Sequence, residues 1–170
     1  MSQSPDPRTD LPPSECLDLQ GPEATATLGA ALAGILRPGD TILLEGPIGA
    51  GKSHLARSLI QTRLAAENRW EDVPSPTFTL VQTYNTDAAQ IVHADLYRLS
   101  DPDEVFELGL DTAFDAAITL VEWPDRLGSD RPDTALTIQL QPRDEGRIAT
   151  LTFPAAWTAR LLPILRGGQP

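Results

Sequence analysis

Residues 46–53 constrain this chain more than any other segment, because they fit the phosphate-binding pattern G-x-x-x-x-G-K-[ST]. Lys52 is the only lysine in the sequence, and every other basic side chain is arginine. A compact ammonium at this one place indicates a role that a planar guanidinium does not serve. Glycines in the loop allow tight turns that point successive N–H groups at an anion. We therefore predict a nucleotide site that includes Gly46, Gly49, Ala50, Gly51, Lys52, Ser53 and His54.

The flanking sequence supplies the context that this motif requires. The short apolar run 41–44 has the character of a buried strand. After the loop, apolar residues recur at helical spacing: Leu55, Leu59, Ile60 and Leu64. Strand, glycine-rich loop and helix together predict that Lys52 reaches the β- and γ-phosphates of ATP and that the Ser53 hydroxyl ligates Mg²⁺.

The rest of the chain alternates strands and helices. Strands are expected at 16–19, 78–84, 91–95 and 118–122, helices at 22–36, 102–108 and 154–165, and a hairpin at 134–141 and 147–153. This order predicts an α/β fold: a single P-loop NTPase-like domain with a mixed, mostly parallel sheet flanked by helices and a C-terminal antiparallel hairpin. We assign residues 15–166 to that domain, 1–14 to a disordered N-terminal tail and 167–170 to a C-terminal tail.

Composition narrows the class of function. The formal net charge of -11 opposes unaided binding to a nucleic-acid backbone. The single cysteine, Cys16, leaves no internal disulfide and suits a reducing compartment. No apolar run approaches the length of a membrane span, and the first residues lack the pattern of a signal peptide. We expect a soluble cytoplasmic protein with no membrane association.

Two acidic residues end apolar runs where strands should reach a ligand. Asp95 follows 91–94 and Glu122 follows 118–121, and ligands of open α/β sheets collect at the carboxyl ends of strands. Solvated acids at strand ends are also common, so Asp95 alone is equally compatible with that simpler role. His93 shares a strand face with Asp95, and a metal pair is conceivable. No third ligand at suitable spacing is visible, which favours a structural His93.

The loop 74–77, Pro-Ser-Pro-Thr, is stiff and rich in hydroxyl groups. It is compatible with an ordinary surface turn, since Pro and Ser often form one. It is equally compatible with a nucleotide-sensing loop in which Thr77 contacts Mg²⁺ or the terminal phosphate.

Several segments in order resemble one family. The P-loop is followed by SPTFTLV at 75–81, HADLYRL at 93–99, ELG at 107–109 and VEWP at 121–124. This combination is similar to the bacterial tRNA threonylcarbamoyladenosine biosynthesis ATPases, the TsaE (YjeE) family, over about residues 20–150. The resemblance implies an ATPase that uses ATP and Mg²⁺ and works with TsaB- and TsaD-type partners. Those partners place a threonylcarbamoyl group on the adenosine 3′ of the anticodon, so contact with tRNA is implied only through the complex.

The resemblance also implies roles for individual residues. Asp95 and Glu122 match the essential acids of the family, with Asp95 assigned to the metal site and Glu122 similar to its Mg²⁺-associated acid. Trp123 matches an aromatic residue that supports activity. Pro22 and Thr25 correspond to the stretch bordering the adenine, and Arg147 matches an arginine of the late hairpin expected near the nucleotide.

The sequence departs from the family pattern at three places. Pro47-Ile48 stands where an acidic residue and leucine are usual, Ser53 replaces a more frequent threonine, and Ala94 replaces an aromatic residue. Ser53 keeps the hydroxyl, so metal ligation is expected to survive. Pro47 removes one N–H donor and fixes one φ angle, which affects loop opening more than chemistry.

Two other functions fit a P-loop. A small kinase would need a second pocket and an arginine-bearing lid, and the one obvious mobile segment, 85–90, contains no arginine. A binding module could use nucleotide for regulation without turnover. Partner-stimulated hydrolysis would separate both from the ATPase.

Overall fold

The computed structural model describes residues 11–167. The predicted tails at 1–14 and 167–170 lie mostly outside the described residues, which exclude 1–10 and 168–170. Regular structure begins with β1 at Ser14 and ends with α5 at Gly167. No helix within this described range is long and apolar enough to cross a membrane.

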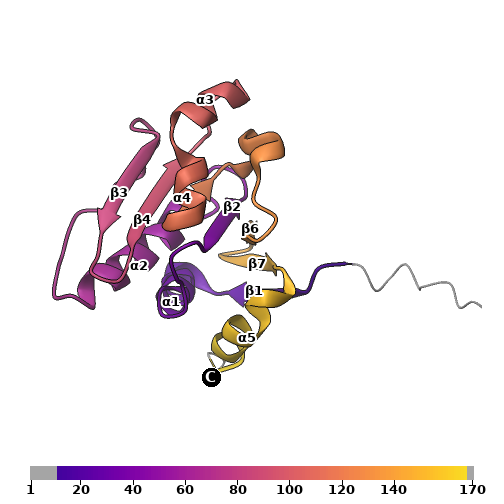
Figure 1. Ribbon diagram of the computed structural model, residues 1–170. Coiled ribbons are helices and arrows are strands. Elements are labelled where there is room, and N and C mark those ends of the chain that lie inside the picture. Colours follow the sequence, from indigo (N-terminus) through magenta and orange to yellow (C-terminus); the bar gives the residue numbers. More distant parts are fainter. Residues whose placement is uncertain (1–10, 168–170) are drawn as a thin grey trace, which may run out of the picture.

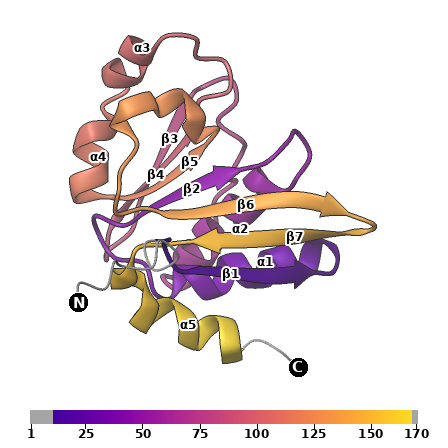
Figure 2. The same cartoon turned by 90° about the vertical axis from the view of Figure 1, so that its right-hand side faces the viewer.

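A seven-stranded mixed sheet with the order β1-β7-β6-β2-β5-β4-β3 forms the centre of the molecule (Figures 1 and 2). The strands are β1 (Ser14–Leu19), β2 (Thr41–Glu45), β3 (Val81–Asn85), β4 (Gln90–Asp95), β5 (Ile118–Glu122), β6 (Leu136–Arg143) and β7 (Gly146–Thr152). β6, β2, β5 and β4 pair in parallel, while β7 and β3 run in the opposite direction. The predicted mixed, mostly parallel sheet and the C-terminal hairpin β6–β7 are therefore confirmed.

Helices cover both faces of the sheet. They are α1 (Gly21–Ala33), α2 (Lys52–Ala65), α3 (Pro102–Glu107), α4 (Leu110–Ala116) and α5 (Thr158–Gly167), with short 3₁₀ segments η1 (Pro124–Asp130) and η2 (Ala155–Trp157). One aliphatic core joins α1, α2 and α5 to the sheet, and a smaller core on the other face includes residues of α3, α4 and η1. Neighbouring residues of β2 divide between these cores, because successive side chains of a strand point to opposite faces: Ile42 and Leu44 to the larger, Leu43 to the smaller.

The contact between α1 and α2 is unusually close at Gly29. A Cβ atom built there would lie 2.8 Å from the carbonyl oxygen of Leu55 and 3.1 Å from the Cβ of Ser58. Glycine therefore lets the two backbones approach, and this contact fixes the position of α1 against the helix that begins at the P-loop. The predicted apolar face of α2, including Leu55, Leu59, Ile60 and Leu64, is fully buried.

Three expectations for local structure were wrong. The strand expected at 78–84 begins only at Val81, because Leu80 adopts φ 66° and its N–H donates to the Pro76 carbonyl in a turn. The first helix ends at Ala33, and Leu36 is buried in the loop that follows. The segments α4 and η1 were not expected. Gly109, taken as a helix stop, has φ 73° and is also the residue before α4.

Candidate nucleotide-binding site

The P-loop connects the central strand β2 to α2, and its three glycines, Gly46, Gly49 and Gly51, all have positive φ angles. Gly46 has φ 141°, and a Cβ atom there would lie 2.4 Å from the Leu140 carbonyl oxygen. Gly51 precedes α2 with φ 106°. These values lie in the left-handed region that glycine alone adopts without strain. The N-terminus of the 14-residue helix α2 therefore meets the loop, where its free N–H groups favour an anion.

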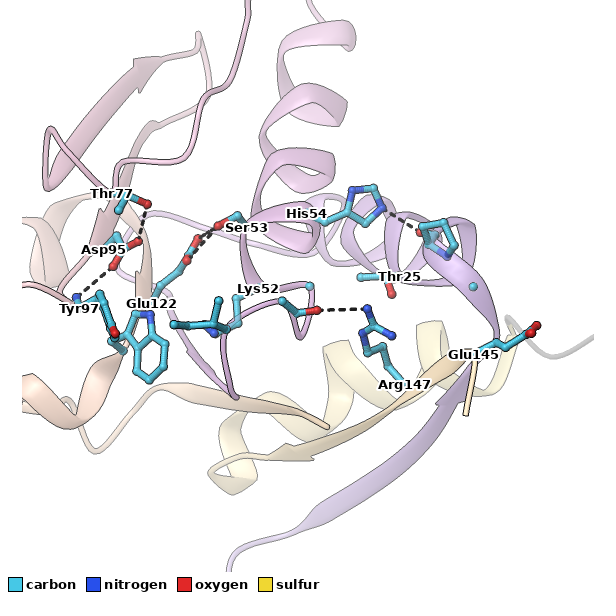
Figure 3. A pocket seen from close by; sticks show the side chains of 16 residues that line it. Thr25, Lys52, Ser53, His54, Thr77, Asp95, Tyr97, Glu122, Glu145 and Arg147 are labelled. Atoms are coloured by element: carbon cyan, nitrogen blue, oxygen red, sulfur yellow. Dashed lines mark hydrogen bonds between the residues drawn. The ribbon is translucent and has the colours of Figure 1, made fainter. Parts of the chain in front are cut away.

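A pocket of about 580 Å³ opens beside this loop (Figure 3). Its volume lies within the range of small-molecule sites. Lys52, Ser53, Thr77, Asp95, Glu122 and Trp123 line one end, and Gly21, Pro22, Thr25, Glu145 and Arg147 line the other. All four residues predicted as catalytic therefore gather around the P-loop lysine, and the residues expected near adenine lie together at the opposite end.

The Lys52 ammonium lies inside the loop. Its Nζ donates to the carbonyl oxygens of Gly46 at 2.7 Å and Pro47 at 2.9 Å, and lies 4.3 Å from the centre of the Trp123 ring. Burial lowers the pKa of Lys52, and the carboxylates of Glu122 and Asp95 oppose that shift. A phosphate in the pocket would supply the negative charge that a partly desolvated ammonium favours.

Glu122 lies at the end of β5 and is only 2% exposed. The Ser53 hydroxyl donates to its two carboxylate oxygens at 2.9 and 3.0 Å, and His93 Nε2 lies 2.9 Å from Oε1. The P-loop serine and the strand carboxylate therefore form one unit. His93 reaches this unit from the neighbouring strand β4 through its contact with Glu122.

Asp95 ends β4 directly beside Glu122, because the two residues are partners in the parallel β4–β5 register. Its Oδ2 accepts a hydrogen bond of 3.1 Å from the Thr77 hydroxyl, and its Oδ1 accepts one of 3.0 Å from the Tyr97 N–H. Thr77 in turn lies 2.8 Å from the Ser75 Oγ. The hydroxyl-rich loop is thus attached to the acid on β4.

Trp123 follows Glu122 in a left-handed conformation, with φ 58° and ψ 54°. Such values are costly for a large side chain, and the following Pro124 also disfavours the right-handed helical region for this residue. The conformation places the indole ring against Tyr97, with 4.8 Å between ring centres, and over Lys52. Backbone strain at such a site is typical of functional residues.

At the other end of the pocket, α1 and α2 meet. The His54 ring donates from Nε2 to the Pro22 carbonyl oxygen at 2.9 Å, because a carbonyl can only accept. Thr25, also on α1, is buried and lines the pocket. His54 therefore fixes the start of α1 against the P-loop helix and lines the pocket with Pro22.

Arg147 projects from β7 to the outside of the P-loop. Its Nε donates to the Ala50 carbonyl at 2.7 Å, its Nη2 to the Gly49 carbonyl at 3.1 Å and its Nη1 to the Gly146 carbonyl at 2.9 Å. The side chain lines the pocket, as expected, but its hydrogen bonds hold the loop itself (Figure 3).

Sequence reasoning did not assign to the site four residues that line the pocket: Gly21, Ile48, Tyr97 and Glu145. Tyr97 lines the pocket beside Trp123, and Glu145 lies at its opposite end. Ser75 reaches Thr77 and lies 3.4 Å from the Ser53 Oγ. The motifs at 75–81 and 93–99 already contained Ser75 and Tyr97, whereas nothing in the sequence distinguished Glu145 from other hairpin acids.

The donor set fits Mg²⁺. No cluster of three or more His, Cys, Asp or Glu side chains able to hold a metal occurs between residues 11 and 167. The pocket instead combines the Ser53 hydroxyl with the carboxylates of Glu122 and Asp95. Mg²⁺ in nucleotide enzymes is held by one or two carboxylates together with substrate phosphates and water, rather than by an all-protein cage.

Comparisons with known proteins identify the family. The profile for "Threonylcarbamoyl adenosine biosynthesis protein TsaE" matches residues 19–149, most of the chain. The chain belongs to the TsaE family. The tRNA threonylcarbamoyladenosine biosynthesis protein TsaE of Rickettsia bellii is 36% identical over 129 residues, which cover 76% of this chain and 88% of that protein. The TsaE protein of Bacillus subtilis is 34% identical over 137 residues, covering 77% and 80%.

The fold of the chain also has a solved counterpart. The crystal structure of YdiB from Bacillus subtilis superposes with a TM-score of 0.73, covering 94% of this chain and 99% of that one at 23% identity. The family resemblance and the P-loop α/β fold predicted from sequence are both confirmed, and nucleotide binding follows from them.

Proposed function

We propose that the chain is the ATP-binding and ATP-hydrolysing component of the machinery that makes threonylcarbamoyladenosine in tRNA. One observation carries this proposal. The pocket that contains Lys52 and Ser53 of the P-loop also contains two carboxylates from neighbouring strand ends, Asp95 and Glu122. A phosphate cradle alone only binds; two buried carboxylates beside it supply the groups that hydrolysis requires.

Each residue has a distinct task in this proposal. The loop N–H groups and Lys52 bind the β- and γ-phosphates and stabilise charge that develops on them. Ser53, Glu122 and Asp95 would hold Mg²⁺, which when bound would neutralise phosphate charge. Asp95, oriented by Thr77 and the Tyr97 N–H, positions the attacking water and accepts its proton. Trp123 packs over Lys52 and excludes water from that side.

Thr77 gives the site a way to sense the nucleotide. Its hydroxyl donates to Asp95, so a γ-phosphate or Mg²⁺ that draws Thr77 inward would also move the loop 74–77. ADP lacks the γ-phosphate and would leave the contact with Asp95 in place.

The acidic surface favours protein partners over direct contact with tRNA. With a net charge of -11, the chain would be repelled by an RNA backbone, so TsaB- and TsaD-type proteins are the proposed contacts and tRNA is reached through them. The proposed location is the cytoplasm, where tRNA is modified.

The segment 85–90 lies too far from Asp95 to serve as the lid that the kinase alternative requires. The turn at 86–89 connects β3 to β4 at the end where Asn85 pairs with Gln90, whereas Asp95 lies at the opposite end of β4. Gln90 and Asp95 are five residues apart along β4, roughly 17 Å at about 3.3 Å per residue. A segment at that distance does not close over the P-loop.

Reconstitution tests the proposal. ATP hydrolysis and threonylcarbamoyladenosine in tRNA would be measured with the chain alone, with the two partners, and with partners plus tRNA. We expect partners to stimulate hydrolysis, and Asp95→Asn or Glu122→Gln to lower the stimulated rate by at least about tenfold, or about 1.4 kcal/mol of barrier. Asp111→Asn is the matched control, since this exposed acid lies outside the pocket. Full modification without the chain, or with Glu122→Gln, would contradict the proposal.

A further inference from the structure

His93 lies on β4 two residues before Asp95, and its side chain is 1% exposed. Its Nε2 lies 2.9 Å from Oε1 of Glu122, whose side chain is 3% exposed. A carboxylate oxygen only accepts, so Nε2 carries the proton and donates. Nδ1 has no hydrogen-bond partner in the described part of the chain. The Nε2–H tautomer leaves only a lone pair unpaired at Nδ1, whereas a second N–H would be buried without an acceptor. The ring is thus a single donor aimed at the carboxylate.

Two groups from different elements hold the Glu122 carboxylate. Ser53 donates from the start of α2, and His93 donates from the neighbouring strand. The terminal torsion of a glutamate is broad, so a carboxylate held by one hydroxyl remains free to rotate. Ser53 is also the hydroxyl that the proposed function assigns to Mg²⁺: its proton is donated to Glu122, and its oxygen lone pairs stay available to the metal. The His93 contact involves only one proposed metal ligand, which is Glu122.

We propose that His93 is a positioning residue that fixes the Glu122 carboxylate for magnesium-dependent nucleotide binding. The inference rests on the proposed function, because it assigns Glu122 to the metal. Partners that orient a metal-ligating carboxylate contribute to metal affinity although they never touch the ion. His93 therefore acts through Glu122 alone.

The test compares two amides that differ in reach. The amide nitrogen of glutamine can occupy the position of histidine Nε2, whereas that of asparagine stops near Nδ1, short of the carboxylate. For wild type, His93→Gln and His93→Asn, calorimetry would measure the affinity for a non-hydrolysable ATP analogue with magnesium and with EDTA. The readout is the ratio of the two affinities, and thermal melting establishes that each variant is folded.

We expect His93→Asn to lower the magnesium ratio by about tenfold or more, the scale for groups that orient metal ligands. His93→Gln should stay within about twofold of wild type, and affinity in EDTA should be the same in all three proteins. A ratio unchanged in His93→Asn, or lost equally in both variants, overturns the inference. If His93→Asn does not fold, His93→Gln decides alone, since loss of its ratio would overturn the inference.

These measurements need neither partners nor tRNA. Failure of partner stimulation would refute the proposed function and leave the role of His93 standing. Equally, an unchanged magnesium ratio would remove His93 from the site while the ATPase proposal stands.

Discussion

Gly29 allows a prediction in which two opposing effects can be weighed. Gly29→Ala introduces a methyl group 2.8 Å from the Leu55 carbonyl oxygen, about 0.6 Å closer than an ordinary contact of about 3.4 Å. The neighbouring atom is backbone within α2, so α1 must move away from α2. Crowding of this kind costs about 1–3 kcal/mol, whereas replacing glycine by alanine in a helix interior gains about 1 kcal/mol. The expected net result is a loss of about 0–2 kcal/mol.

Gly34→Ala is the matched control on the same helix. Gly34 is the C-cap of α1 with φ -70°, and a Cβ atom there meets only the Ala31 carbonyl oxygen at 3.5 Å. The substitution should therefore stabilise the protein by about 0.4–1 kcal/mol, because it restricts the unfolded chain. The two variants should differ by about 0.4–3 kcal/mol, and each 1 kcal/mol shifts Tm by about 2–4 °C for a chain of this size.

Thermal and urea unfolding followed by circular dichroism would measure the difference. Because α1 carries Thr25 and α2 carries Lys52, Gly29→Ala should also weaken ATP binding, whereas Gly34→Ala should not. If Gly29→Ala proves as stable as Gly34→Ala, the close contact does not constrain the helices and the reasoning fails.

Further predictions concern the nucleotide. Lys52→Ala should weaken ATP binding by about 1–3 kcal/mol, the scale of a charge-assisted hydrogen bond, and unchanged affinity by calorimetry in a folded variant would contradict its role. Arg147→Met should lower ATP affinity because the Gly49 and Ala50 carbonyls lose their donor, while Arg143→Met on the exposed end of β6 should have no effect. Hydrogen exchange at 78–81 should slow more with a non-hydrolysable ATP analogue than with ADP; equal protection would reduce the loop at 74–77 to a structural turn.

The sequence predicted the parts of the fold that depend on local pattern. The P-loop and the apolar stripe of α2 have fixed spacings, so the order of residues alone locates both. The apolar runs ending in Asp95 and Glu122 identified the two neighbouring strands, β4 and β5, that carry acids. Their direct pairing could not be read from the sequence, because strand order and register depend on the whole sheet.

Other features of the site could not be predicted from the sequence, and the reasons are again physical. Trp123 adopts a left-handed conformation that no propensity favours for tryptophan, and only packing against Tyr97 and Lys52 accounts for it. Arg147 was expected near the nucleotide, but its hydrogen bonds to the loop depend on where the hairpin passes the P-loop. The contact between His93 and Glu122 joins two strands whose neighbourhood is again a property of the sheet.

The pairing of β1 with β7 also determines how late in synthesis the sheet can be completed. Within the described residues, β1 pairs with β7 alone, so the first of these strands to be synthesised waits for the last. Arg147 belongs to that same late strand, and without it the Gly49 and Ala50 carbonyls lack their donor. A ligand stabilises only a chain that already has its binding site. Nascent chains and fragments cut short before the hairpin therefore gain little stabilisation from cellular ATP, which leaves them exposed to proteases while the finished protein is protected.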